Sequence, residues 1–126
     1  MKRLVIDLDG TLTQLNTKDY EKVLPRLDVI KKLTEYKELG FEIVIFTARN
    51  MRTFEGNIGK INIFTLPIIV KWLDKHNVPY DEILVGKPWC GTDGFYVDDR
   101  AIRPSEFSEL TPLQIESLFK KENECF

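Results

Sequence analysis

The sequence is poor in cysteine and histidine, and this limits the chemistry that it can support. It contains two cysteines and one histidine among 126 residues. Two cysteines cannot form the disulfide framework of a small secreted domain, so we expect Cys90 and Cys125 to be free thiols in a reducing compartment. Zinc prefers His and Cys ligands, and we expect the one histidine, His76, to be a structural residue at a helix end. These shortages favour a cytoplasmic protein without a zinc site.

Long apolar runs and an excess of one charge are also missing. The most apolar stretch, residues 61–73, is interrupted by polar residues and falls short of the ~20 apolar residues that span a bilayer. The N-terminus reaches Asp7 before a signal-peptide apolar region can form. Eighteen Lys and Arg against 20 Asp and Glu leave a net charge of -2, which provides no basic field for a nucleic-acid backbone. We therefore expect no membrane segment and no nucleic-acid partner.

The residues that are present indicate one α/β domain. A chain of 126 residues with 43% hydrophobic residues can bury a single core. Buried strands are expected at four apolar runs, residues 3–8, 41–46, 83–85 and 95–97. Helices are expected over residues 27–39 and 65–76, and from Thr111 onwards. This alternation predicts a doubly wound, mostly parallel sheet in one domain over residues 1–126.

Two longer segments, residues 12–25 and 49–62, are expected to be irregular. Neither approaches the ~50 residues of an independent domain. Residues 49–62 carry two glycines and several polar side chains, so we expect a functional loop beside the site.

Polar residues follow each of the four expected strands. They are Asp7 with Asp9, Thr47, Lys87, and Asp98 with Asp99. In open parallel sheets, ligands bind outside the carboxyl ends of the strands. We therefore expect these side chains to face one crevice.

The residue types at these strand ends point to phosphoryl transfer. Four carboxylates in one crevice would repel one another unless a hard cation lay among them. Magnesium is the expected cation, because it takes oxygen ligands and keeps waters that a phosphate oxygen can replace. Gly10 permits a sharp turn after Asp9 and Thr11 offers a hydroxyl. Thr47 and Lys87 could donate a hydroxyl and a positive charge to the same phosphate.

The same motifs, in this order, resemble the haloacid dehalogenase superfamily of aspartyl phosphotransferases. The matching segments are Asp7-Leu8-Asp9-Gly10-Thr11, Val44-Ile45-Phe46-Thr47, Lys87 and Val97-Asp98-Asp99. More narrowly, Gly86–Gly91, Gly94–Arg100 and Arg103–Phe107 resemble a subgroup known as capsule polysaccharide biosynthesis phosphatases. The resemblance implies a three-layer, Rossmann-like fold with strand order about 3-2-1-4. It also implies a capless type, because neither irregular segment could form a cap domain.

The resemblance implies a role for each motif residue. Asp7 would be the nucleophile that forms an aspartyl phosphate, and Asp9 the general acid and then the base. Thr47 and Lys87 would hold the phosphoryl oxygens. The implied magnesium ligands are Asp7, Asp9 through its carbonyl, Asp98 and Asp99.

Residues around the same strand ends are expected to contact the substrate. They are Gly10, Thr11, Ala48, Arg49 and Arg52, although polar loop residues such as the two arginines more often belong to a solvated face. The expected substrate is a small phosphorylated metabolite, such as a sugar phosphate used in surface or capsular polysaccharide biosynthesis. An uncapped site is open to water, so we expect a large substrate or a neighbouring subunit of a homo-oligomer to close it.

Two alternatives remain open at the level of sequence. A signalling receiver domain also combines acidic residues, a Thr, a Lys and magnesium on a doubly wound sheet. Such a domain keeps its phosphorylated Asp on a middle strand, whereas the acidic pairs here begin and end the series. The second alternative is a magnesium-binding module without catalytic activity.

Overall fold

The computed structural model describes residues 1–15 and 19–124, and the chain divides into two compact units. The first unit is Met1–Trp89 and the second is Cys90–Phe126. Cys125, expected to be a free thiol, lies outside the described residues. The single domain over residues 1–126 stays a prediction.

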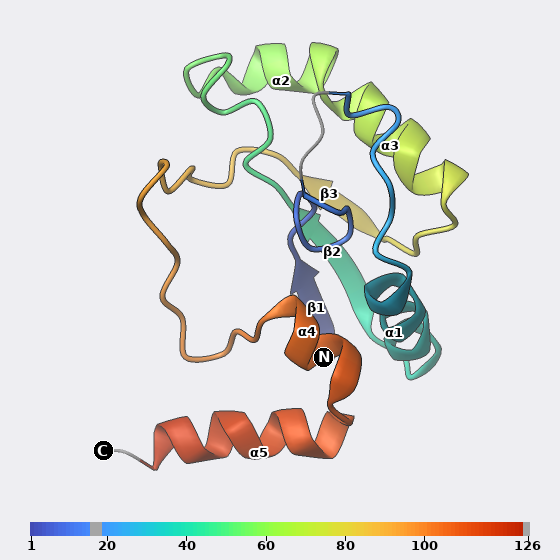
Figure 1. Ribbon diagram of the computed structural model, residues 1–126, viewed down its shortest axis with the longest axis vertical. Helices are drawn as coiled ribbons and strands as arrows, with labels where there is room; N and C mark the ends of the chain where they lie inside the picture. The colour runs from blue at the N-terminus through green and yellow to red at the C-terminus, as the bar shows by residue number, and fades with distance from the viewer. Residues whose placement is uncertain (16–18, 125–126) are drawn as a thin grey trace. The chain divides into compact units, whose positions relative to one another are not determined.

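The first unit contains a three-stranded parallel sheet with the order β1-β2-β3 (Figure 1). The strands are β1 (Arg3–Ile6), β2 (Glu42–Phe46) and β3 (Glu82–Leu84). Because all three strands are parallel, their carboxyl ends lie at the same edge of the sheet. The α/β class and the first three predicted strands are confirmed, whereas a four-stranded order is not shown.

Among the described residues, three helices belong to the first unit and two to the second. They are α1 (Leu27–Glu38), α2 (Ile58–Phe64), α3 (Leu66–Lys75), α4 (Pro104–Glu109) and α5 (Pro112–Asn123). The predicted helices at 27–39, at 65–76 and after Thr111 are confirmed with small changes in their bounds. At the start of α5, Thr111 and Gln114 form the expected capping box. The short helix α4 was not foreseen.

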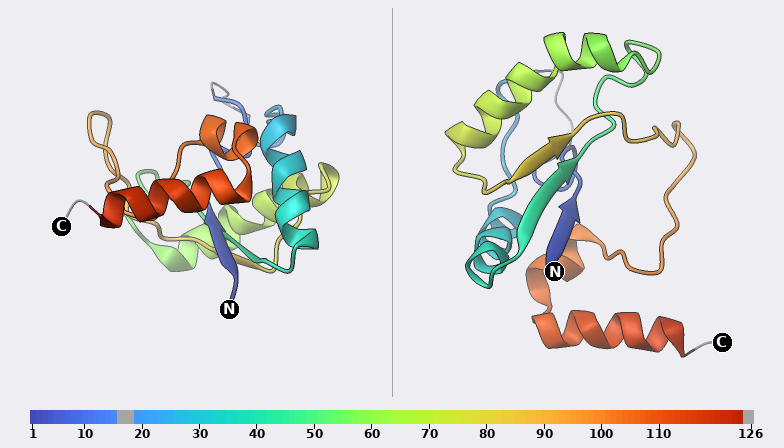
Figure 2. Two further views of the ribbon diagram at one scale, coloured as in Figure 1. Left: turned by 90° about the horizontal axis from the view of Figure 1, so that it is seen from below. Right: turned by 180° about the vertical axis from the view of Figure 1, so that it is seen from behind.

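The expectation of an irregular segment over residues 49–62 is wrong in its last part. The chain makes turns up to Gly56 and then enters α2, where the Asn57 side chain accepts a hydrogen bond from the Lys60 backbone N–H at 3.1 Å. Figure 2 shows α2 and α3 following one another closely. Thr65, between them, has helical backbone angles and donates its hydroxyl to Asn50 Oδ1 at 2.7 Å, so its side chain does not cap α3.

The core of the first unit is formed by one set of apolar side chains from the strands and helices. Its fully buried members include Leu8, Leu12, Val29, Leu33, Ile43, Ile45, Ile61, Ile69 and Leu73. Val5 in β1 is 58% exposed, so the expectation of a buried strand over residues 3–8 is wrong for one face of β1. β1 lies at an end of the three-stranded sheet, and only alternate side chains, such as Ile6, enter the core.

The predicted strand at residues 95–97 does not form in the structure. Phe95, Tyr96 and Val97 are irregular in backbone and 80%, 52% and 88% exposed. The described residues of the second unit contain no strand, so no neighbouring strand is present there to form a ladder with this segment. Aromatic and β-branched residues favour a pleated surface only where neighbouring strands and a core accept them. None of the helices in the described residues is long and apolar enough to span a membrane.

Candidate active site at the carboxyl edge of the sheet

The loop after β1 places Asp7 and Asp9 at the carboxyl edge of the sheet. Leu8 between them is fully buried, and its carbonyl accepts hydrogen bonds from the N–H groups of Thr11, Leu12 and Thr13. This tight turn passes through Gly10, whose φ of +82° is a left-handed conformation that a side chain would strain. A Cβ at Gly10 would also lie 2.9 Å from the Leu15 side chain. Burial of Leu8 leaves both neighbouring carboxylates partly exposed.

Asp7 meets one cation and one hydroxyl. Its Oδ1 lies 3.5 Å from Lys87 Nζ, and its Oδ2 accepts a hydrogen bond from Thr11 Oγ1 at 3.1 Å. The side chains of Lys87 and Asp7 are 19% and 34% exposed, so the pair is partly shielded from solvent. The first and third motifs therefore meet in the structure.

Lys87 and Thr47 are held together by backbone hydrogen bonds that continue the pairing of β2 and β3. The Thr47 N–H donates to the Leu84 carbonyl at 3.0 Å, and the Lys87 N–H donates to the Thr47 carbonyl at 3.1 Å. Gly86 has a φ of +88°, and a Cβ there would lie 2.7 Å from Ile58 Cδ1. The turn before Lys87 therefore requires glycine.

Asp9 meets a second cation, Arg49. Arg49 Nη2 donates to Asp9 Oδ1 at 2.7 Å and Arg49 Nε donates to Oδ2 at 3.1 Å, which makes the pair bidentate. The Arg49 backbone N–H also donates to Thr47 Oγ1 at 3.0 Å. We name Asp7, Asp9, Thr47, Arg49 and Lys87 the strand-end cluster.

Other predicted site residues lie in different places. Ala48 is half-buried next to Thr47, and Arg52 is exposed, with its guanidinium 5.5 Å from the centre of the Trp89 ring. Asp98 and Asp99 belong to the second unit and are exposed, and Asp98 Oδ1 accepts a hydrogen bond from the Arg100 N–H at 2.8 Å. Within the described residues, no three His, Cys, Asp or Glu side chains form a group that could hold a metal ion.

The structure adds two contacts that no sequence pattern indicated. The Tyr20 ring lies 4.0 Å from the Arg49 guanidinium carbon, and Asn50 accepts the Thr65 hydroxyl described above. Both contacts join residues that are far apart in the chain, so neither spacing nor periodicity could reveal them.

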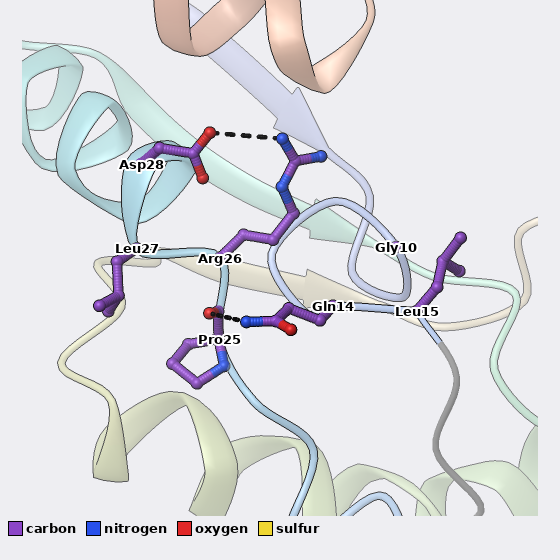
Figure 3. A pocket seen from close by; sticks show the side chains of 7 residues that line it. All are labelled: Gly10, Gln14, Leu15, Pro25, Arg26, Leu27 and Asp28. Carbon is purple, nitrogen blue, oxygen red and sulfur yellow. Dashed lines mark hydrogen bonds and ion pairs between the residues drawn. The ribbon is translucent and has the colours of Figure 1, made fainter.

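A pocket of about 560 Å³ lies in the first unit, at the loop that follows β1 (Figure 3). It is lined by Gly10, Gln14, Leu15, Pro25, Arg26, Leu27 and Asp28. Its polar groups already bind one another, because Gln14 Nε2 donates to the Pro25 carbonyl and Arg26 pairs with Asp28 at 3.3 Å. Gly10 connects this pocket with the turn that carries Asp9.

The fold and this geometry define an α/β protein with a polar site at the carboxyl edge of a parallel sheet. The chain is 74% identical to a protein from Vibrio cholerae whose crystal structure was determined as an MCSG target. The match covers 97% of this chain and 99% of that one, with a TM-score of 0.96. The chain therefore belongs to the same family as the Vibrio cholerae protein.

A more distant likeness is found in the Pnkp1/Rnl/Hen1 complex. One of its chains is 26% identical to this one, with a TM-score of 0.51, and the match covers 86% of this chain but only 34% of the longer one. A structure described as the Pnkp1/Rnl/Hen1 RNA repair complex is 22% identical, with a TM-score of 0.49. No protein-family model and no curated protein matches the chain.

Proposed function

We propose that this protein is a magnesium-dependent phosphomonoester hydrolase of the haloacid dehalogenase superfamily, of the capless type. The main observation that supports the proposal is the ion pair between Asp7 Oδ1 and Lys87 Nζ, 3.5 Å apart at the carboxyl edge of the sheet. Thr47 is bonded to both Lys87 and Arg49 through its backbone carbonyl and its hydroxyl. Three of the four motifs of that superfamily thus share one edge of one sheet.

In the proposed reaction, the Asp7 carboxylate attacks phosphorus and forms an aspartyl phosphate. The bond from phosphorus to the leaving oxygen breaks, and Asp9 donates a proton to that oxygen. Asp9 then takes a proton from a water that attacks the phosphorus of the aspartyl phosphate. This second step releases inorganic phosphate and restores the Asp7 carboxylate. Lys87 and the Thr47 hydroxyl stabilise the charge on the phosphoryl oxygens.

The donors of this chain suit magnesium in their chemistry, because the candidate ligands are all oxygen atoms. The residues that would hold the ion are Asp7, Asp9 through its carbonyl, Asp98 and Asp99. A bound magnesium would neutralise charge on the transferred phosphoryl group. This assignment requires residues 95–99 to join the sheet of residues 1–89, in the order 3-2-1-4.

The proposed substrate is a small phosphorylated metabolite in the cytoplasm, such as a sugar phosphate of surface or capsular polysaccharide biosynthesis. Arg52 is well placed to contact the part of the substrate beyond the phosphate, because it is exposed and lies on the ring of Trp89. Gly10, Thr11 and Ala48 are the other proposed substrate contacts. A homo-oligomer in which a neighbouring subunit covers the uncapped site belongs to the same proposal.

The first experiment compares wild type with Asp7→Asn on an aryl phosphate in the presence of magnesium. The substitution preserves size but removes the attacking carboxylate, so we expect phosphate release to fall at least a thousandfold with an unchanged circular dichroism spectrum. Asp93→Asn, an exposed carboxylate of the second unit, is the matched control and should retain full activity. Normal turnover by Asp7→Asn would contradict the covalent mechanism.

The same assay separates the alternatives and the substrate classes. A receiver-like domain would form a long-lived phosphoprotein without steady phosphate release. A magnesium-binding module without catalytic activity would show neither phosphorylation nor phosphate release. A panel of sugar phosphates, nucleotides and small acid phosphates should identify the substrate class. The panel also includes a phosphorylated RNA end as a further substrate class. Preference for the RNA end would overturn the expectation of no nucleic-acid partner.

A further inference from the structure

The guanidinium of Arg49 is the most enclosed charged group of the strand-end cluster. Its side chain is 1% exposed, whereas that of Asp9 is 37% exposed. Two of its nitrogens donate to the two carboxylate oxygens of Asp9, and Tyr20 lies against its face at 4.0 Å. Burying a cation in this way is costly unless its partner is held in good geometry.

Because its guanidinium is buried, Arg49 cannot contact a ligand as directly as the exposed Arg52 can. The third nitrogen of Arg49, Nη1, is buried and has no hydrogen-bond partner among the described residues. A substrate oxygen could reach it only if neighbouring side chains moved. Arg52 is exposed and available to a ligand. Arg49 can therefore influence a reaction most directly through the carboxylate that it holds.

We propose that Arg49 is a positioning residue for Asp9, and not the substrate contact that its sequence position led us to expect. The inference rests on the proposed function, in which Asp9 gives a proton to the leaving oxygen and later takes one from water. A bidentate guanidinium fixes both the position and the plane of a carboxylate. Each carboxylate oxygen keeps a second lone pair, so the group can still exchange a proton with a reactant.

The backbone of Arg49 connects this role to the phosphate-holding residues. Its N–H donates to Thr47 Oγ1 at 3.0 Å, and the Thr47 carbonyl accepts the Lys87 N–H. The short segment after β2 thus fixes the position of Asp9, the proposed acid and base, relative to Thr47 and Lys87, the proposed phosphate ligands. Proton transfer requires the reacting atoms to lie within hydrogen-bond distance, so a displaced Asp9 carboxylate should lower kcat and leave substrate binding nearly unchanged.

The test uses Arg49→Lys, which retains the charge but cannot form the bidentate pair. We expect kcat for an alkyl phosphate to fall roughly a hundredfold, as for the loss of acid catalysis, with KM changed less than about twofold. With an activated aryl phosphate, which needs little protonation, the first step should continue and acid quenching should trap more aspartyl phosphate. Arg3→Lys at the opposite edge of the sheet, in an exposed ion pair with Glu82, is the matched control and should behave as wild type.

A double variant decides whether Arg49 acts through Asp9. Adding Arg49→Lys to Asp9→Asn should cause no further loss of kcat, because the group that Arg49 positions is already absent. Independent losses that multiply, or a raised KM with an unchanged kcat, would overturn the positioning role.

Urea unfolding of wild type, Arg49→Lys, Asp9→Asn and the double variant distinguishes failure of this inference from failure of the proposed function. The pair should show coupling in the free energy of unfolding whatever the protein catalyses. Coupling in stability together with no phosphate release by wild type on the whole panel would overturn the proposed function and leave the pair purely structural. If wild type releases phosphate but the two substitutions show no coupling in kcat or in the free energy of unfolding, the positioning role alone is overturned.

Discussion

Asp7 and Asp9 are two residues apart, yet each meets a different cation. Lys87 lies 3.5 Å from Asp7, and Arg49 binds Asp9 through two nitrogens. The repulsion between these two carboxylates is therefore offset by side chains of the same unit. The case for magnesium at this edge then depends on Asp98 and Asp99 and on the chemistry of phosphoryl transfer.

Arg52 is the residue at which recognition can be tested apart from chemistry. We expect Arg52→Ala to raise KM roughly tenfold for the best substrate of the panel, the size of one hydrogen bond to a charged group. Hydrolysis of a small aryl phosphate should barely change, because that substrate offers nothing beyond its phosphate. Steady-state kinetics on both substrates measure the difference.

Arg52→Lys is the control for this prediction, because it keeps the positive charge and should lose less affinity. A uniform fall in kcat on both substrates with unchanged KM would indicate that Arg52 supports the catalytic groups. Specificity would then have to come from elsewhere, such as Arg100, Arg103 or a neighbouring subunit.

At the scale of elements, hydrogen bonds of Asp81 join the segment before β3 to the start of β2 and to α1. Its carboxylate accepts hydrogen bonds from the Ile43 N–H at 2.8 Å and from Lys37 Nζ at 2.7 and 2.8 Å. Its own N–H donates to the Ile43 carbonyl at 2.8 Å. The backbone hydrogen bond from Ile43, followed by the bond from Lys37, lowers the pKa of Asp81 below its ordinary value near 3.8.

This lowered pKa makes stability depend on pH in a defined direction. A carboxyl whose pKa is lower in the folded chain stabilises the fold above its unfolded pKa, and that contribution is lost as the pH falls through the folded pKa. We expect Asp81→Asn to lower Tm at pH 7 and to have a diminishing effect below about pH 4. Thermal unfolding followed by circular dichroism between pH 3 and 7 measures the change.

Asp93→Asn serves as the control for Asp81→Asn, because Asp93 is an exposed carboxylate of the second unit. A difference in Tm between wild type and Asp81→Asn that stayed constant across the pH range would show that the ionised carboxylate does not provide the stabilisation.

At the scale of the whole molecule, the motif residues are divided between two units. Asp7, Asp9, Thr47 and Lys87 belong to Met1–Trp89, whereas Asp98 and Asp99 belong to Cys90–Phe126. The proposed function requires a contribution from both units to one metal site. The exposed side chains of residues 95–97 are the part of the second unit that would have to join the sheet.

Magnesium dependence tests whether the second unit contributes to the site. We expect Asp98→Asn to raise the magnesium concentration for half-maximal activity roughly ten- to a hundredfold, because a carboxylate ligand is lost. Phosphate release measured over a magnesium titration gives this value, and Asp93→Asn should leave it unchanged. An unaltered titration curve for Asp98→Asn would show that the metal is held without Asp98.

The sequence by itself determined the local elements of this protein. The apolar runs before Asp7, Thr47 and Gly86 predicted three strands, because a buried parallel strand requires continuous apolar residues. The helices predicted over residues 27–39 and from Thr111 onwards have nearly the bounds of α1 and α5. From these, the meeting of Asp7, Thr47 and Lys87 at one edge could be inferred, since parallel strands end together.

Only the tertiary structure decided which groups bind one another and which segments pair. Arg49 was expected to face the substrate, but its burial against Asp9 and Tyr20 depends on contacts between distant parts of the chain. Residues 95–97 have the composition of a strand, but a strand requires a neighbouring strand, and the described residues of the second unit contain none. Composition and spacing report local preference, whereas ion pairs, burial and strand pairing are decided by what the rest of the fold brings alongside.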